Sequence, residues 1–186
     1  FGYLAAYVYD FLILARNRMI DKTKGVVEAK WKITEKPTVA FGSGDSVEYL
    51  SVNSTAKDTG YFLDQAAYTR DLLVRWIMDE CRSIGSLEDP GDSIDEDDEP
   101  SGEDAHTAQR LAGGLNWLAT RTRPDISFIV SQLSSAATKA PKSAIALGKR
   151  TLRYLAGTRE HGILMDARAS GPVPRDGGDA QRSRES

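Results

Sequence analysis

The first fifteen residues are apolar at almost every position, a pattern typical of strands rather than of an amphipathic helix. In residues 3–15, "YLAAYVYDFLILA", β-branched and aromatic residues predict two short strands around a turn near Tyr9 and Asp10. Asp10 is either a turn residue or a functional group, because an ionised carboxylate is costly to bury without a partner. Residues 20–32, which follow, are weakly helical.

Two more strands and a helix come next. The segments "VEYLSVNS" (47–54) and "GYFLD" (60–64) predict a hairpin in which Gly60 suits the bend. Asp64 can then cap a helix over residues 65–78. Apolar side chains recur every four residues on one face of this helix, at Tyr68, Leu72 and Trp76.

The apolar positions after residue 105 follow the period of helices. In the first segment, 106–122, they are Leu111, Leu115, Leu118 and Ala119. A second helix begins near Pro124, and its apolar positions are Ile126, Ile129, Val130 and Leu133. Pro141 opens a third helix that ends at Gly157. The whole pattern predicts an α+β fold: antiparallel hairpins and one helix, followed by three helices.

The distribution of charge divides the chain further. Residues 88–104 contain ten acidic and no basic residues, whereas residues 105–165 contain nine basic and two acidic ones. The acidic run is of low complexity, and such segments bury too little apolar surface to fold. We therefore predict a mixed segment 1–84, an acidic disordered linker 85–104, a helical segment 105–165 and a disordered tail 166–186.

The third helix, 142–157, has a cationic stripe. At 100° per residue, Lys142, Lys149 and Arg153 fall within about 40° of one another, and Arg150 lies beside them. Apolar residues occupy the far side. Such a helix can bind a phosphate backbone while it packs its back, or it can be an ordinary solvated face.

Composition excludes several classes of protein. One Cys and two His allow neither a disulfide framework nor a zinc cluster, and they suggest a reducing, intracellular setting. No segment reaches the roughly 18 apolar residues of a membrane span, so no membrane partner is expected. The sequence starts with Phe1 inside an apolar run, which suggests a piece of a longer protein.

Three ordered motifs in the second half resemble one family. They lie in "AQRLAGGLNWLATRTRPDISFIVSQLSS" and "ALGKRTLRYLAGTREHGILM". The first motif is a Gly-Xaa-Leu-Xaa-Tyr-Leu-Ala run, which Gly114, Leu115, Leu118 and Ala119 fit with Trp117 in the aromatic place. The other two are Thr-Arg-Pro-Asp-Ile at 122–126 and Lys-Arg-Xaa-Leu-Arg-Tyr-Leu-Xaa-Gly-Thr at 149–158. Together they resemble copia-like retrotransposon Pol polyproteins, in the part that joins reverse transcriptase to RNase H.

The first half resembles the same family. "AAYVYDFLI" is similar to the Tyr-Val-Asp-Asp-Xaa-Leu-Ile polymerase hairpin, and "GYFLDQAAYTRDLLVRW" to a strand and the first thumb helix. The resemblance implies that segment 1–84 is the end of the palm and the start of the thumb, and that segment 105–165 is thumb and connection. It also implies an RNA or DNA template-primer as partner, within a longer polyprotein.

The resemblance gives Asp10 a role and raises a difficulty. In the family, two adjacent Asp residues at the hairpin turn and a third from an upstream strand hold two Mg²⁺ ions for nucleotide addition. Asp10 matches the second Asp and Tyr9 stands at the first. A phenol with an ordinary pKa of about 10 is a poor Mg²⁺ ligand. We therefore expect Asp10 to be a remnant catalytic residue and a weak metal ligand, in a chain that is inactive by itself and binds no Mg²⁺ productively.

Two alternatives remain beside this inactive polymerase fragment. The chain could be a non-catalytic module that binds nucleic acid through helix 142–157, or a helical module whose acidic linker recruits basic proteins. Reversing the charge of Lys149, Arg150 and Arg153 distinguishes the two, because only nucleic-acid binding depends on the cationic stripe.

Overall fold

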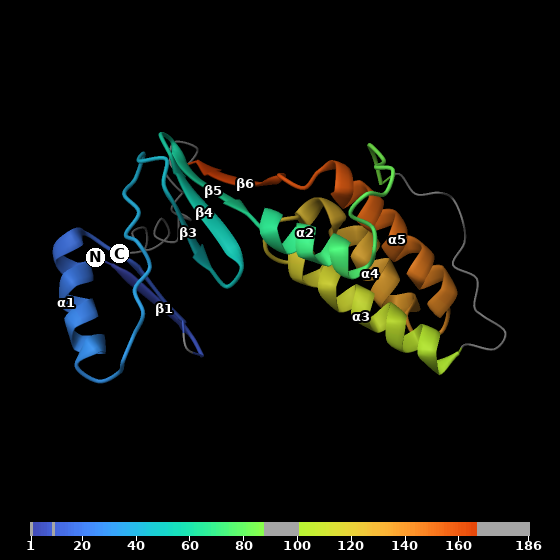
Figure 1. Cartoon of the computed structure of the whole chain (residues 1–186), viewed down its shortest axis with the longest axis horizontal. Helices are drawn as coiled ribbons and strands as arrows, with labels where there is room; N and C mark the ends of the chain where they lie inside the picture. The colour runs from blue at the N-terminus through green and yellow to red at the C-terminus, as the bar shows by residue number, and fades with distance from the viewer. Residues whose placement is uncertain (1, 9, 88–100, 167–186) are drawn as a thin grey trace, which may run out of the picture.

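The computed structural model describes residues 2–8, 10–87 and 101–166. Its elements form a hairpin with a helix, a four-stranded sheet and a helical bundle (Figure 1). The first unit consists of β1 (Tyr3–Tyr7), β2 (Asp10–Leu14) and α1 (Asn17–Glu28). The sheet consists of β3 (Ser46–Tyr49), β4 (Val52–Lys57), β5 (Gly60–Asp64) and β6 (Gly162–Asp166). The bundle consists of α2 (Ala66–Arg75), α3 (Gly102–Ala119), the 3₁₀ turn η1 (Pro124–Ile126), α4 (Ser127–Ala136) and α5 (Pro141–Gly157).

The described strands pair only in antiparallel fashion, and the predicted α+β class is confirmed. The N-terminal hairpin forms at the predicted place, with Tyr7 opposite Asp10. One face of the hairpin contacts the residues that follow α1. The ring centres of Phe11, in β2, and Trp31 lie 6.5 Å apart. Tyr9, which the sequence places in the turn, lies outside the described residues.

The second hairpin differs from the prediction. Residues 47–54 were expected to form one strand, but they divide into β3 and β4, which pair with each other. Leu50 and Ser51 make the tight turn, with φ angles of 52° and 60°. A type I′ hairpin turn requires this left-handed conformation at both central residues and usually contains Asn or Gly. The turn was missed because neither Leu nor Ser signals it.

The expectation that residues 105–165 are all helical, with a tail from 166, is wrong at its C-terminal end. Residues 162–166 form β6, which pairs with β5 and places Leu164 opposite Phe62. A Cβ atom on Gly60 would clash with the backbone of Met165, and one on Gly162 with the backbone of Leu63. Two glycines therefore allow the chain to return to the sheet that its first half built.

The linker boundary also needs correction. Residues 102–104, assigned to the disordered linker, form the first turn of α3. The Ser101 hydroxyl accepts hydrogen bonds from the backbone N–H groups of Glu103 and Asp104, at 3.2 and 3.5 Å. The two carboxylates also favour a helix start through the helix dipole. The rest of the acidic run, 88–100, and the tail from 167 lie outside the described residues.

Helix α2 begins one residue later than predicted, at Ala66 with Gln65 rather than Asp64 in the N-cap position, and it also ends earlier. An Asp64 carboxylate oxygen accepts a hydrogen bond from Ala66 N–H at 3.0 Å. The helix stops at Arg75 rather than continuing to Met78, and Ile77 has a φ of 55°, which a helix cannot accommodate.

The predicted apolar faces of the bundle helices meet in one core. Its fully buried members include Leu72, Leu111, Leu115, Leu118, Ile126, Leu133, Leu152 and Leu155. Gly148 of α5 lies so close to α3 that a Cβ atom there would overlap Leu111 and come within 3.0 Å of Leu133 Cδ1. Within the described ranges, no helix is long and apolar enough to cross a membrane.

We predict that Gly148→Ala destabilises the bundle by about 1–3 kcal/mol, because the added methyl group overpacks a filled core. Gly113→Ala on the outer side of α3 is the matched control. A Cβ atom there meets nothing within 4 Å, so the better helix propensity of Ala should stabilise α3 by up to about 1 kcal/mol. Urea unfolding followed by circular dichroism measures both changes. Equal effects from the two substitutions would contradict the packing at Gly148.

Candidate nucleic-acid interface

Arg123 is the most deeply buried charge of the described residues, with 2% of its side chain exposed. Its Nε donates to one Asp125 carboxylate oxygen at 3.0 Å and its Nη2 to the other at 2.7 Å. Its Nη1 and Nη2 also donate to the carbonyl and hydroxyl oxygens of Thr158, both at 2.8 Å. A planar guanidinium suits this fork geometry, which Lys cannot reproduce.

Tyr154 completes the cluster from α5. Its hydroxyl donates to an Asp125 carboxylate oxygen at 2.9 Å, and its ring lies 5.5 Å from the Arg123 guanidinium carbon. Burial by itself would raise the pKa of Asp125, but the hydrogen bonds and charge of Arg123 and the bond from Tyr154 outweigh it and lower that pKa. Burial and the bond to Asp125 raise the pKa of Tyr154. We call Arg123, Asp125, Tyr154 and Thr158 the arginine cluster.

Two further bonds attach the helices near this cluster. Thr122 donates its hydroxyl hydrogen to the side-chain carbonyl of buried Gln65, at 3.0 Å, and so joins the end of α3 to the start of α2. Arg70 and Glu160 form an ion pair of 2.7 Å at the surface. These contacts position the bundle against the sheet. The ion pair with Arg70 also occupies the Glu160 carboxylate.

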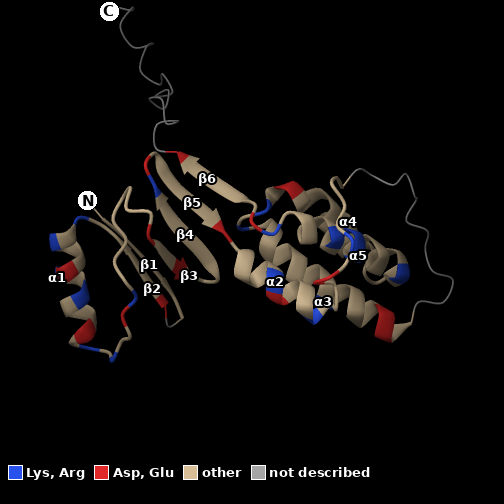
Figure 2. Ribbon diagram, turned by 45° about the horizontal axis from the view of Figure 1, so that its top comes forward, with Lys and Arg blue, Asp and Glu red and all other residues tan. Residues whose placement is uncertain are grey.

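The predicted cationic stripe lies on the side of α5 that faces away from the core. Lys142 and Lys149 are exposed, and Arg150 and Arg153 are partly buried. Arg153 also has a structural contact, because its Nε donates to the carbonyl of Arg82 at 3.0 Å. Figure 2 shows basic residues on α5 and acidic ones at the start of α3. We call the side of α5 that holds these four cations the α5 cationic face.

A second basic surface, on α3, was missed from the sequence. Arg121 stacks on Trp117, with its guanidinium carbon 3.8 Å from the ring centre, and Arg110 lies 5.8 Å from the ring centre of Trp76. Gly113 of α3 lies between these two Arg–Trp pairs, and its exposed backbone carries no side chain. The spacing of Arg110 and Trp117 was the available signal, because residues seven apart share a helix face; Arg121 follows the end of α3. Guanidinium groups and aromatic rings in this arrangement suit bases and phosphates.

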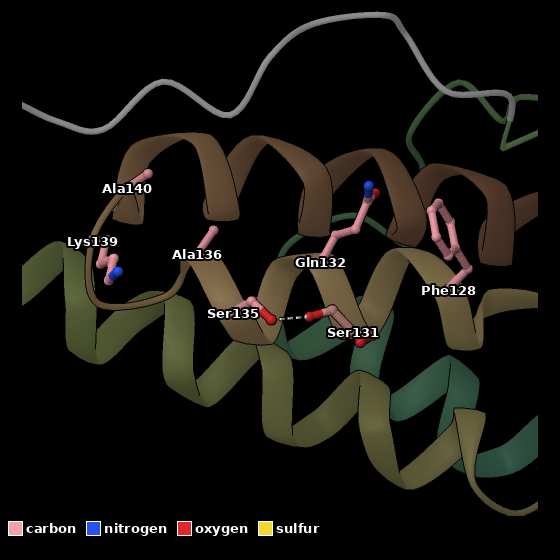
Figure 3. Close-up of a pocket in the computed structure, with 7 residues that line it drawn as sticks. All are labelled: Phe128, Ser131, Gln132, Ser135, Ala136, Lys139 and Ala140. Carbon is pink, nitrogen blue, oxygen red and sulfur yellow. Dashed lines mark hydrogen bonds between the residues drawn. The ribbon is translucent and has the colours of Figure 1, made fainter.

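A hollow along α4 offers less chemistry. Figure 3 shows the residues that line it, which are Phe128, Ser131, Gln132, Ser135, Ala136, Lys139 and Ala140. Ser135 donates its hydroxyl hydrogen to the carbonyl oxygen of Ser131 at 3.0 Å. Lys139 is the one charged residue in its lining, so the hollow has no pair of groups for acid and base chemistry.

Asp10 does not join a metal site in the described part of the chain. It is exposed at the first position of β2. Across the described residues, no three His, Cys, Asp or Glu side chains lie close enough together to hold a metal ion. Two-metal catalysis needs several carboxylates at one place. The described residues therefore do not fit the pair of Mg²⁺ ions that the family resemblance implies.

Comparison with known proteins identifies the relatives of this chain. Over 164 residues, 88% of the chain, it is 27% identical to the retrovirus-related Pol polyproteins from transposons RE1 and RE2 of Arabidopsis thaliana. The chain is homologous to retrotransposon Pol polyproteins. It also resembles an uncharacterized mitochondrial protein of Arabidopsis thaliana, with 26% identity over 167 residues, 88% of this chain and 65% of that protein.

The homology confirms the resemblance to copia-like Pol polyproteins. The chain spans 11% of the length of each of the two Pol polyproteins. No protein-family model matches it, and no solved structure does.

The Pol-like motifs gain a physical explanation from the arginine cluster. Thr-Arg-Pro-Asp-Ile supplies Arg123 and Asp125, and the motif in α5 supplies Tyr154 and Thr158. Two sequence motifs almost thirty residues apart thus meet in one hydrogen-bonded unit. The residues between the two motifs form η1, α4 and the start of α5, and these elements bring the chain back to the arginine cluster.

We predict that Asp125→Ala lowers the free energy of unfolding by about 1–3 kcal/mol at pH 7, because the buried guanidinium of Arg123 loses its carboxylate. The folded-state pKa of Asp125 is depressed, so its stabilisation is present above the unfolded pKa of about 4 and disappears as pH falls through the folded value. Urea titrations at pH 7 and at pH 3 should therefore show a smaller difference between variant and unaltered chain at pH 3.

Glu160→Ala is the control for Asp125→Ala. It removes the surface ion pair with Arg70, and exposed pairs contribute little. Its unfolding midpoint should stay close to that of the unaltered chain. If the difference in free energy of unfolding between Asp125→Ala and the unaltered chain stays constant from pH 7 to pH 3, the depressed pKa of Asp125 is contradicted.

Proposed function

We propose that this chain derives from the reverse transcriptase part of a copia-like Pol polyprotein and binds nucleic acid through its helical bundle without polymerising by itself. The observation that supports binding most directly is the α5 cationic face, on the outside of a bundle whose core is complete within the described residues. A template-primer supplies the row of phosphates that such a surface attracts.

The excess positive charge of the bundle supports this proposal. Residues 105–165 contain only two acids, Asp125 and Glu160. Asp125 is bound by Arg123, and Glu160 is paired with Arg70. Lys149 is exposed, so its charge is directed to solvent, where salt-dependent binding of phosphates begins.

The α3 surface supports the same function by different chemistry. Trp117 with Arg121, and Trp76 with Arg110, combine flat rings with cations that bases and phosphates can contact. Gly113 between them lets another backbone approach α3 closely, since no side chain stands in the way.

The proposal that the chain is inactive by itself rests on the hairpin. Tyr9 stands where the family has the first Asp, and among the described residues Asp10 belongs to no group of three or more side chains that could hold a metal ion. We therefore propose that the chain binds no Mg²⁺ productively and that template binding is its remaining biochemical property.

We predict that Lys149→Glu weakens binding of a fluorescent 18-base-pair RNA–DNA hybrid by about three- to tenfold at low salt, because a phosphate contact is lost. Each lost contact also lowers the slope of log affinity against log salt concentration by about 0.7–0.9. Fluorescence anisotropy at two salt concentrations measures both quantities. Lys22→Glu, the same charge change on the exposed side of α1, is the matched control and should bind like the unaltered chain. Equal affinity of the Lys149→Glu and unaltered chains would favour the alternative of a helical protein-interaction module.

We also predict that neither the unaltered chain nor Tyr9→Asp extends a DNA primer on an RNA template with Mg²⁺. The Tyr9→Asp variant restores one carboxylate of the family pair but not the upstream one. Gel analysis of the labelled primer measures extension, and a commercial reverse transcriptase on the same primer is the positive control. Extension by the unaltered chain would show that the proposal of inactivity is wrong.

A further inference from the structure

We propose that the hollow along α4 binds an unpaired stretch of a nucleic-acid strand, with a base against the ring of Phe128 and a phosphate at Lys139. These two residues lie at opposite ends of the hollow (Figure 3). The polar side chains of Ser131, Gln132 and Ser135 lie between them. This inference rests on the proposed function, because it adds a single-stranded ligand to a bundle that is proposed to bind a duplex at α5.

The ring of Phe128 is the apolar part of the site. Phe128 is the second residue of α4, and 70% of its surface is exposed. Ile129, Val130 and Leu133 of the same helix are buried in the bundle core, so Phe128 lies on the outer side. Among the described residues, no aromatic ring pairs with Phe128 and no cation lies over it. A base can stack on such a ring whatever its identity, because every base has a π-face.

Gln132 supplies hydrogen-bonding groups beside the ring. It lies one turn of helix after Phe128, and both side chains are on the same side of α4 (Figure 3). The side-chain amide of Gln132 has two donors and an acceptor, which suit the edge of a base. Ser135 donates its hydroxyl hydrogen to the carbonyl oxygen of Ser131 at 3.0 Å, so the Ser135 oxygen can accept a further bond. A base stacked on Phe128 therefore has polar groups within one or two turns of helix.

Lys139 gives the hollow its charge. It is exposed, it lies three residues after the end of α4, and the lining of the hollow contains no acidic residue. The salt bridges among the described residues do not include Lys139. A positive charge in a lining without acids attracts an anion and repels a cationic ligand. The hollow therefore suits a ligand that is flat and aromatic in one part and negatively charged in another, as a nucleotide is.

The shape of the hollow favours an unpaired strand over a duplex. The buried residues of its lining are Ala136 and Ala140, whose methyl groups occupy little space. Its volume is about 320 Å³, at the lower end of the roughly 300–1,000 Å³ of small-ligand sites. The hollow is open on its outer side, so a strand can continue beyond both ends. In a duplex the neighbouring base pairs cover the faces of each base, so only an unpaired base can place its face against Phe128.

The test compares two labelled strands of equal charge, hexathymidylate and an abasic strand with the same sugars and phosphates but no bases. Phe128→Ala is made in the full-length chain, and Phe41→Ala, at an exposed Phe outside the hollow, is the matched control. At about 50 mM salt, Phe128→Ala should bind hexathymidylate at least about fivefold more weakly than the unaltered chain, and the abasic strand within about twofold of it. Phe41→Ala should bind both strands like the unaltered chain. Fluorescence anisotropy measures these affinities.

Two further variants separate the ring from the charge. Phe128→Tyr keeps an aromatic ring and should retain the affinity for hexathymidylate. Lys139→Gln removes the charge, so it should weaken the binding of both strands equally and lower the slope of log affinity against log salt concentration by about 0.7. Lys22→Gln, the same change at an exposed residue of α1, is the control and should leave the slope unchanged.

The outcomes distinguish the inference from the proposed function. If Phe128→Ala binds hexathymidylate like the unaltered chain, or loses affinity for both strands equally, the inference is overturned. The effect of Lys149→Glu on the RNA–DNA hybrid then still decides the proposed function. If no chain binds the hybrid, the proposed function is overturned for a duplex. A loss of hexathymidylate binding alone in Phe128→Ala then supports the inference, and absence of strand binding overturns it.

Discussion

The buried guanidinium of Arg123 is the constraint on which the arrangement of the helical half depends. A fully buried cation is tolerated only when its charge and its donors are satisfied, and here Asp125 and Thr158 do both. The two partners come from η1 and from the residue that follows α5. Satisfying one side chain therefore fixes where α3 ends, how the chain turns into α4 and where α5 stops. A Lys at the same place would supply one point charge without the fork.

The sheet provides the second constraint. Strand β6 adds to the edge of β5 only because glycine stands at both contact points, Gly60 and Gly162. The last described residues of the chain are thereby paired with a strand from its first half. The arginine cluster lies next to this junction, so the bundle and the sheet are joined through β6, through the start of α2 and through Gln65 with Thr122.

The charged side chains of segment 105–165 follow a different arrangement from its buried apolar ones. The two acids of segment 105–165 are both engaged by arginines, Glu160 by Arg70 and Asp125 by Arg123. The exposed lysines of α5, Lys142 and Lys149, therefore carry the positive charge of this half of the chain outward.

The sequence by itself determined the helices of the bundle and their buried faces. Leu111, Leu115, Leu118, Ile126 and Leu133 are buried as their spacing predicts, because the helical period is a local property of the chain. It also determined the position of the first hairpin, the family resemblance and the cationic side of α5. The proline at the start of α5 and the glycine at its end marked both bounds correctly.

Only the tertiary structure decided which distant segments meet. The turn at Leu50 and Ser51, the strand β6 and the α3 surface with its stacked Arg121 depend on partners far away in the sequence, and no local pattern reports them. Asp125 lies in the first turn of η1, and folding also makes it the partner of the buried Arg123. The physical reason is common to all of these cases: strand pairing and buried charge are satisfied across the fold, whereas helix period and capping are satisfied within a few residues.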